Sequence, residues 1–111
     1  MKSENRDAVK FYYKSVKKNF LAVLCIEQGN YILKKGSTVS STVSEHFKSY
    51  KTVKKRRIDA GITDDDLTLK SDIVFSSSSV AGEFVSGCSC NGPASWKIKN
   101  GITLKEWKEM K

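Results

Sequence analysis

Residues Phe75–Lys97 read FSSSSVAGEFVSGCSCNGPASWK, and this stretch decides how the C-terminal half of the chain is organised. The apolar run 73–75 predicts a short strand, and it ends at four serines whose hydroxyl groups favour the N-cap of a helix. Gly87 suits the left-handed position that follows a helix. We therefore predict a short helix that ends before Gly87 and is capped by one of Ser76, Ser77 and Ser79.

The order of these elements allows two interpretations, a folding device or a recognition surface. Ala81 and Gly82 would let the helix approach another element closely, and the Asn-Gly-Pro turn then leads to Trp96. If the stretch is a folding device, Phe75 and Trp96 are expected to be largely buried, because aromatic side chains contribute most when they leave water.

The N-terminal half combines a predicted helix with a predicted hairpin. Residues 3–19 open with a possible N-cap and carry acidic residues early and lysines late, which favours a helix. Two apolar runs then flank Gln28-Gly29, a pair suited to a tight turn, so Leu21–Glu27 and Asn30–Lys35 are expected to pair as a β-hairpin.

Four further elements follow from periodicity and capping. The range Val43–Ile58 places apolar side chains on one helical stripe and precedes Gly61, which suits a helix end. Leu67 and Leu69 indicate a short strand before that at 73–75, and Trp96–Lys99 indicates another. A terminal helix should be capped by Thr103 and Glu106 as a capping box. Its inward side chains are expected to be Leu104, Trp107 and Met110.

These elements predict an α+β fold, a small and mostly antiparallel sheet with helices packed on it. The chain has 111 residues, of which 39% are hydrophobic and 29% charged, and this suits one globular core. We expect residues 1–20 to form an N-terminal helix and residues 21–111 to form a single α+β domain.

The charge and the N-terminal sequence predict a basic cytoplasmic protein. Lysine and arginine outnumber acidic residues by 20 to 12, for a formal charge of +8, and such a surplus favours polyanionic partners. No run approaches the roughly 20 apolar residues that a bilayer span needs, and the N-terminus lacks the apolar core of a secretory signal. The odd number of cysteines suggests reduced thiols.

The sequence carries no recognisable catalytic or metal-binding pattern. His46 has no nucleophile tied to it by a known motif, and a solvated helix histidine is the simpler interpretation. Cys88 and Cys90 lack the second ligand pair of a structural zinc site, and the acidic run 64–66 lacks the spacing of a calcium loop. We therefore expect no enzyme activity, no cofactor and no metal.

A basic segment is the strongest indication of a partner. Six lysines and arginines occur in residues 48–57 without an acidic residue, and on a helix Lys48, Lys51 and Lys55 would share one face suited to phosphates. A solvated lysine face is the alternative. The predicted contacts with nucleic acid are therefore the phosphate-facing Lys48, Lys51, Lys55 and Arg56, and the base-reading Ser77, Ser79 and Asn91.

Several segments in this order resemble one family. NYILKKGS (30–37), IDAGI (58–62), the stretch 72–97 and GITLKEW (101–107) are similar to the domain of unknown function 4357. The pattern spans about residues 31–107. Two positions depart from it: Ser78 stands where the family usually has proline, and Gly82 where it usually has alanine. Both changes loosen the start of the helix.

The resemblance implies an accessory role close to nucleic acid. Members often follow GIY-YIG nuclease-like domains, and part of the pattern is similar to a domain associated with restriction and adenine methylation. We therefore expect a non-catalytic, nucleic-acid-associated binding domain in prokaryotes, with DNA or RNA as the partner. The alternative is a protein-interaction module that docks through the N-terminal helix or the Asn91–Trp96 turn. Neither interpretation involves a membrane.

Overall fold

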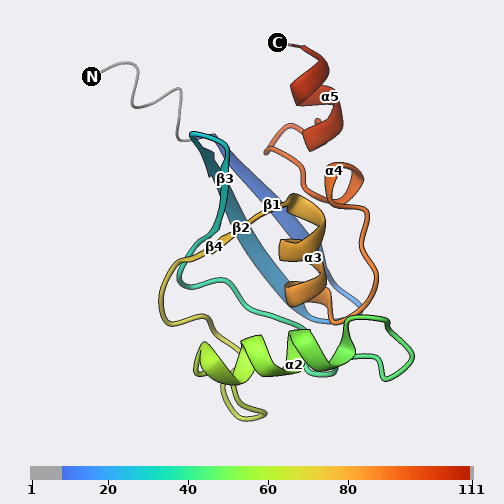
Figure 1. Cartoon of the computed structure of the whole chain (residues 1–111). Helices are drawn as coiled ribbons and strands as arrows, with labels where there is room; N and C mark the ends of the chain where they lie inside the picture. The colour runs from blue at the N-terminus through green and yellow to red at the C-terminus, as the bar shows by residue number, and fades with distance from the viewer. Residues whose placement is uncertain (1–8, 111) are drawn as a thin grey trace.

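The structure, a computed structural model, describes residues 9–110 and contains a four-stranded antiparallel sheet in the order β1-β2-β3-β4. The strands are β1 (Lys10–Ser15), β2 (Phe20–Glu27), β3 (Asn30–Leu33) and β4 (Ile73–Phe75). The helices in the described range are α2 (Tyr50–Asp59), α3 (Ser78–Ser86), α4 (Gly92–Ser95) and α5 (Leu104–Glu109). In Figure 1, α3, α4 and α5 stand beside the sheet and α2 crosses near one end of α3. The predicted α+β class is confirmed.

The hairpin between β2 and β3 forms as predicted. Glu27 pairs with Asn30 across a two-residue turn, in which Gln28 and Gly29 both have positive φ angles of 51° and 83°. This is the backbone that a two-residue hairpin needs, and glycine adopts it without a steric cost. The second strand is shorter than expected and ends at Leu33.

The predicted N-terminal helix is wrong for the residues that the structure describes, because Lys10–Ser15 is the edge strand β1. Residues 1–8 lie outside the described range. Phe11 is fully buried opposite Leu24, whereas the alternate residues Lys10 and Lys14 are exposed, so the segment follows the two-residue period of a strand. Val16, which follows this strand, is 83% exposed.

The second helix begins later than predicted, at Tyr50 rather than near Val43. The residues before Tyr50 form no helical hydrogen-bond pattern. The Ser44 amide donates to Gly87 O at 2.8 Å, and turns follow up to Tyr50. The buried face of α2 is Val53 and Arg57, and Ile58 is 69% exposed. The predicted stripe was therefore rotated relative to the actual one.

Capping residues determine where the helices α3 and α5 begin and where α3 ends. The Ser77 hydroxyl accepts a hydrogen bond from Val80 N at 3.1 Å, and Gly87 ends α3 in the left-handed conformation. Thr103 and Glu106 form both halves of the capping box that starts α5. These predictions are confirmed.

Two predicted strands and one predicted core residue are corrected. Residues 67–69 bond irregularly to residues 36–39, with one isolated bridge between Thr38 and Thr68. Residues 96–99, which follow the end of α4 at Ser95, also form no strand. Among them only Lys97 forms isolated bridges, to Tyr12 and to Thr103. Met110 is 69% exposed, since α5 ends at Glu109.

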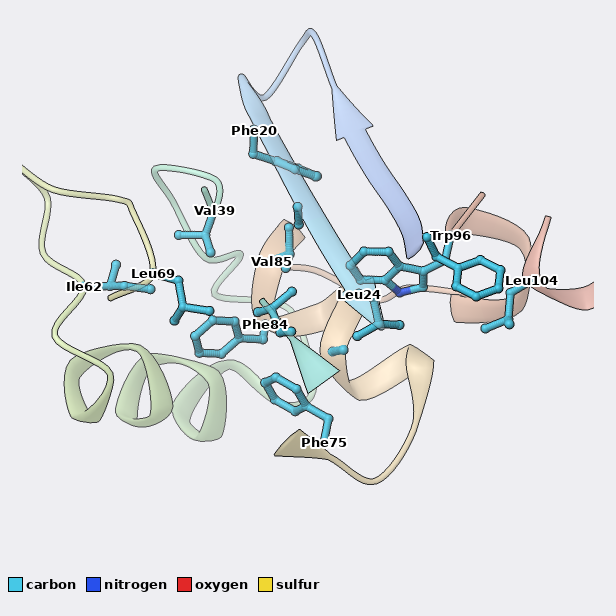
Figure 2. Close-up of a cluster of buried hydrophobic side chains, with 14 residues drawn as sticks. Phe20, Leu24, Val39, Ile62, Leu69, Phe75, Phe84, Val85, Trp96 and Leu104 are labelled. Atoms are coloured by element: carbon cyan, nitrogen blue, oxygen red, sulfur yellow. The ribbon is translucent and has the colours of Figure 1, made fainter. Parts of the chain in front are cut away.

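The core lies between the sheet and the helices. Figure 2 shows Trp96 beside Leu104 at one end, Ile62 and Leu69 at the other, and Phe84 between them. Phe75 is 2% exposed and Trp96 is fully buried, as predicted for a folding device. The residues of the opposite sheet face are less covered: Leu21 is 47% and Val74 58% exposed.

Candidate nucleic-acid interface

The serine and asparagine side chains that the sequence predicted to read bases bond instead to the backbone. Ser77 caps α3, the Ser79 hydroxyl accepts from Gly92 N at 3.0 Å, and Asn91 Oδ1 accepts from Ala94 N at 3.3 Å. The bond between Ser79 and Gly92 joins the N-terminus of α3 to the N-terminus of α4, and the other two cap α3 and α4. The arrangement favours the folding-device interpretation of this stretch.

The N-termini of α3 and α4 also pack closely against each other, and we call this contact the α3–α4 joint. The Trp96 indole Nε1 donates to Ser78 O at 3.0 Å, and a Cβ added to Gly92 would overlap Ser78 and the backbone of Ser79. Glycine is therefore required at position 92 because no side chain fits between the two helix starts.

Gly82 gives a testable consequence of this packing. A Cβ at Gly82 would overlap Cys90 Sγ. Although alanine favours a helix by about 1 kcal/mol over glycine, Gly82→Ala is expected to lower the free energy of unfolding by about 1–2 kcal/mol through overpacking. Chemical denaturation measures this change.

The double variant Gly82→Ala/Cys90→Ala is the matched control for that prediction. Removing the sulfur opens the space for the new methyl group, so the two substitutions should couple favourably by about 1 kcal/mol or more. Additive losses would contradict the idea that Cys90 occupies the space above Gly82.

The basic segment divides into residues with different tasks. Lys48 precedes α2 and is exposed, and Lys51 is exposed on the helix. Lys55 Nζ pairs with Asp59 at 3.4 Å, and the Arg56 guanidinium lies 5.2 Å from the centre of the Phe75 ring. The predicted face of three lysines is therefore not a continuous helical face, because its first member lies outside the helix.

Arg57 is the one member of this segment that is buried. It is 6% exposed and donates to Phe84 O at 3.0 Å, Val85 O at 3.1 Å and Ser40 O at 2.8 Å. Burial lowers the pKa of Arg57 to about 10, so the guanidinium remains charged at neutral pH. A cation at the C-terminal carbonyls of a helix satisfies groups that have no intrahelical donor. Arg57 thus holds α2 against the end of α3.

The two predicted sets of contacts lie near opposite ends of α3. Arg57 anchors the basic helix at the C-terminus of α3, whereas Ser77 and Ser79 occupy its N-terminus. Figure 1 shows α2 crossing near one end of α3 and α4 near the other. The structure does not place them as one continuous surface.

A different basic groove runs along the edge strand β1. Its volume is about 760 Å³, and it lies between β1 and the segment 94–101. Two backbone bonds hold these walls together: Tyr12 N donates to Lys97 O and Lys97 N donates to Tyr12 O at 2.6 and 3.0 Å. We call this feature the β1 groove. It is lined by Tyr12, Tyr13, Lys14, Leu21, Ala94, Ser95, Lys97, Ile98, Lys99 and Gly101.

The β1 groove combines positive charge with aromatic surface. Lys14, Lys97 and Lys99 are exposed, and no acidic residue is among the described residues that line the groove. Tyr12 is half-buried in the wall. Tyr13 packs edge-on against Trp96 at 5.4 Å, and burial, with the nearby Cys90, raises the pKa of its hydroxyl. Tyr13 therefore belongs to the core side, whereas Tyr12 is available at the surface.

Sequence reasoning missed the β1 groove, although a signal was present. In KFYYK the alternation places Lys10, Tyr12 and Lys14 on one face of a strand, and KIK repeats that spacing at Lys97 and Lys99. The helical interpretation of residues 3–19 hid the first pattern. Nothing local in the sequence indicates that the two patterns meet in space.

Comparisons with known proteins identify a family but no activity. Within residues 9–110, no helix is long and apolar enough to cross a bilayer, and no group of three His, Cys, Asp or Glu residues could hold a metal ion. No curated protein and no solved structure matches the chain. The family described as domain of unknown function (DUF4357) matches residues 11–108, from the first residues of β1 to the last turn of α5. The chain therefore belongs to the DUF4357 family.

Proposed function

We propose that this domain binds single-stranded nucleic acid without catalysing a reaction on it, and that the β1 groove is the contact surface. The observation that carries the proposal is the meeting of Lys14, Lys97 and Lys99 beside the half-buried ring of Tyr12. Cationic grooves track the phosphate backbone, and an aromatic side chain offers a face on which an unpaired base stacks. The formal charge of +8 supports association with a polyanion.

The basic helix is a weaker candidate for the same function. Lys54 Nζ lies 5.3 Å over the Tyr50 ring, Lys55 pairs with Asp59, and Arg57 is buried. Lys48, Lys51 and Arg56 are exposed and can add long-range attraction. In this proposal α2 assists association, and the domain acts as a cytoplasmic accessory unit of a prokaryotic nuclease or restriction system.

The salt dependence of binding tests the groove directly. Fluorescence anisotropy with single-stranded DNA, single-stranded RNA and the matching duplex would be measured from low to high salt. Changing Lys14, Lys97 and Lys99 together to serine is expected to make the logarithmic salt slope shallower by about 2 units on single strands, since each lost phosphate contact contributes about 0.7.

The matched control removes the same charge from the basic segment 48–57, by changing Lys48, Lys51 and Lys55 to serine. This variant should keep most of the wild-type slope. Tyr12→Leu should weaken single-strand binding by about 1–3 kcal/mol at an unchanged slope, because it removes stacking and no charge. Equal losses in the two triple variants would show that total charge, not the β1 groove, determines binding.

A protein-interaction module is the second candidate function. The open face of the sheet exposes Leu21 and Val74, and an apolar surface of this kind would bind a protein with little dependence on salt. Absence of binding to every nucleic acid at low salt, where ionic attraction is strongest, would reject the first candidate in favour of this one.

A further inference from the structure

The three cysteines occupy three different environments. Cys25 is 3% exposed in the second half of β2. Cys90 is half-buried, and its sulfur lies 3.6 Å from Ser95 Oγ above Gly82. Cys88 is also half-buried, but its sulfur lies 3.0 Å from the ammonium group of Lys18. Only this thiol of the three has a cation within hydrogen-bond distance among the described residues.

The contact between Lys18 and Cys88 is built by the fold. Lys18 lies in the turn between β1 and β2, 70 residues from Cys88 in the sequence, and its Nζ also approaches Ser86 O at 3.4 Å. The Cys88 amide and sulfur both approach Ser86 Oγ, at 3.4 and 3.6 Å. The carbonyl at the end of α3 thus helps to hold the ammonium group beside the sulfur.

Some surroundings of Cys88 raise the pKa of its thiol and others lower it, and the influences that stabilise the thiolate prevail. Burial is the largest single influence and raises the pKa of the thiol, and the charge of Glu83 acts in the same direction. Hydrogen bonds from Lys18 and Ser86, with the Lys18 charge, outweigh both, so the pKa of Cys88 lies below its ordinary value. Burial raises the pKa of Cys25 and of Cys90.

We propose that Cys88 is a modification site, a thiolate held by Lys18 that reacts with hydroperoxides and other soft electrophiles while Cys25 and Cys90 are spared. In the peroxide reaction the thiolate sulfur attacks one peroxide oxygen. A sulfur–oxygen bond forms, the oxygen–oxygen bond breaks, and hydroxide, or the alkoxide of an organic hydroperoxide, leaves and is protonated by solvent. Sulfur gives up two electrons and becomes a sulfenic acid, which a thiol reductant can reverse.

Labelling rates measured residue by residue test this assignment. The folded protein would be treated with limiting iodoacetamide at neutral pH, and separately with hydrogen peroxide and dimedone, and the labelled peptides quantified by mass spectrometry. Cys88 is expected to react at least about tenfold faster than Cys90 or Cys25, since reactivity follows thiolate content and access.

Variants of Lys18 separate the role of the ammonium group from exposure alone. Lys18→Met is expected to slow the labelling of Cys88 by about fivefold or more, Lys18→Arg to retain most of the rate, and Lys17→Met to leave it unchanged. Denaturation curves of the same variants show whether each remains folded. Labelling of Cys88 at the wild-type rate in folded Lys18→Met, or faster labelling of Cys90 than of Cys88, would overturn the proposal. If Lys18→Met does not fold, the comparison of Cys88 with Cys90 in the wild-type protein decides.

Discussion

Replacing Arg57 with methionine is expected to lower the free energy of unfolding by about 2–4 kcal/mol, measured by chemical denaturation. Arg57 is 6% exposed, and its guanidinium donates to Phe84 O and Ser40 O. Methionine fills most of the volume but donates no hydrogen bond, so both carbonyl oxygens would remain buried without their present donor. Val85 O suffers less, because it also accepts from the Ser40 amide at 2.8 Å.

The neighbouring Arg56 is the matched control. It is exposed on α2, and its guanidinium lies 5.2 Å from the centre of the Phe75 ring, a cation–π contact worth about 0.5–1 kcal/mol. Arg56→Met should therefore cost less than about 1 kcal/mol while removing the same charge from the same helix. Similar losses in the two variants would mean that helix charge, rather than the bonds of Arg57, stabilises the contact between α2 and α3.

Arg57 also shows where sequence reasoning stops. In the sequence it is one of a run of cations, and no local feature indicates that it bonds to distant carbonyl groups. Its burial depends on the C-terminal carbonyls of α3 and on Ser40, which lie far away in the chain and become neighbours only in the folded protein. The predicted phosphate contacts in this run therefore ended at Arg56 and gave Arg57 no role, and only the tertiary structure shows what Arg57 does.

Local chemistry explains the features that were predicted well. The Ser77 cap, the Gly87 end and the Thr103–Glu106 capping box each depend on residues within one or two turns of one another. The hairpin at Gln28-Gly29 depends on the same short range. Such interactions are visible in the sequence because the partners are adjacent in it.

The β1 strand was missed because its segment fits two periods. Residues 8–16 can form an apolar stripe on a helix, but they can also alternate as Phe11 and Tyr13 against Tyr12 and Lys14. Pairing with β2 selects the second pattern, because it buries Phe11 completely and satisfies the backbone. The β1 groove inherits this difficulty, since Tyr12 and Lys97 come together only after β1 has formed.

Trp96→Ala is expected to cause the largest loss of stability, about 3–5 kcal/mol of the free energy of unfolding. The indole is fully buried and lies edge-on to Tyr13 at 5.4 Å. The indole Nε1 donates to Ser78 O at 3.0 Å. The backbone carbonyl oxygen of Trp96 accepts from Leu104 N at 2.8 Å. Removing the ring would leave a cavity where β1 and the starts of α3 and α5 meet.

Two further variants separate packing from hydrogen bonding at this position. Trp96→Phe keeps much of the aromatic volume but loses the donor to Ser78 O, so it should cost about 1–2 kcal/mol beyond the effect of the smaller ring. Val74→Ala, at a side chain that is 58% exposed, should change stability by less than about 0.5 kcal/mol. A loss under about 1 kcal/mol for Trp96→Ala would mean that the ring contributes little to the core. In that case the α3–α4 joint would not depend on Trp96 for its stability. The stretch from Phe75 to Lys97 would then be better explained as a recognition surface than as a folding device.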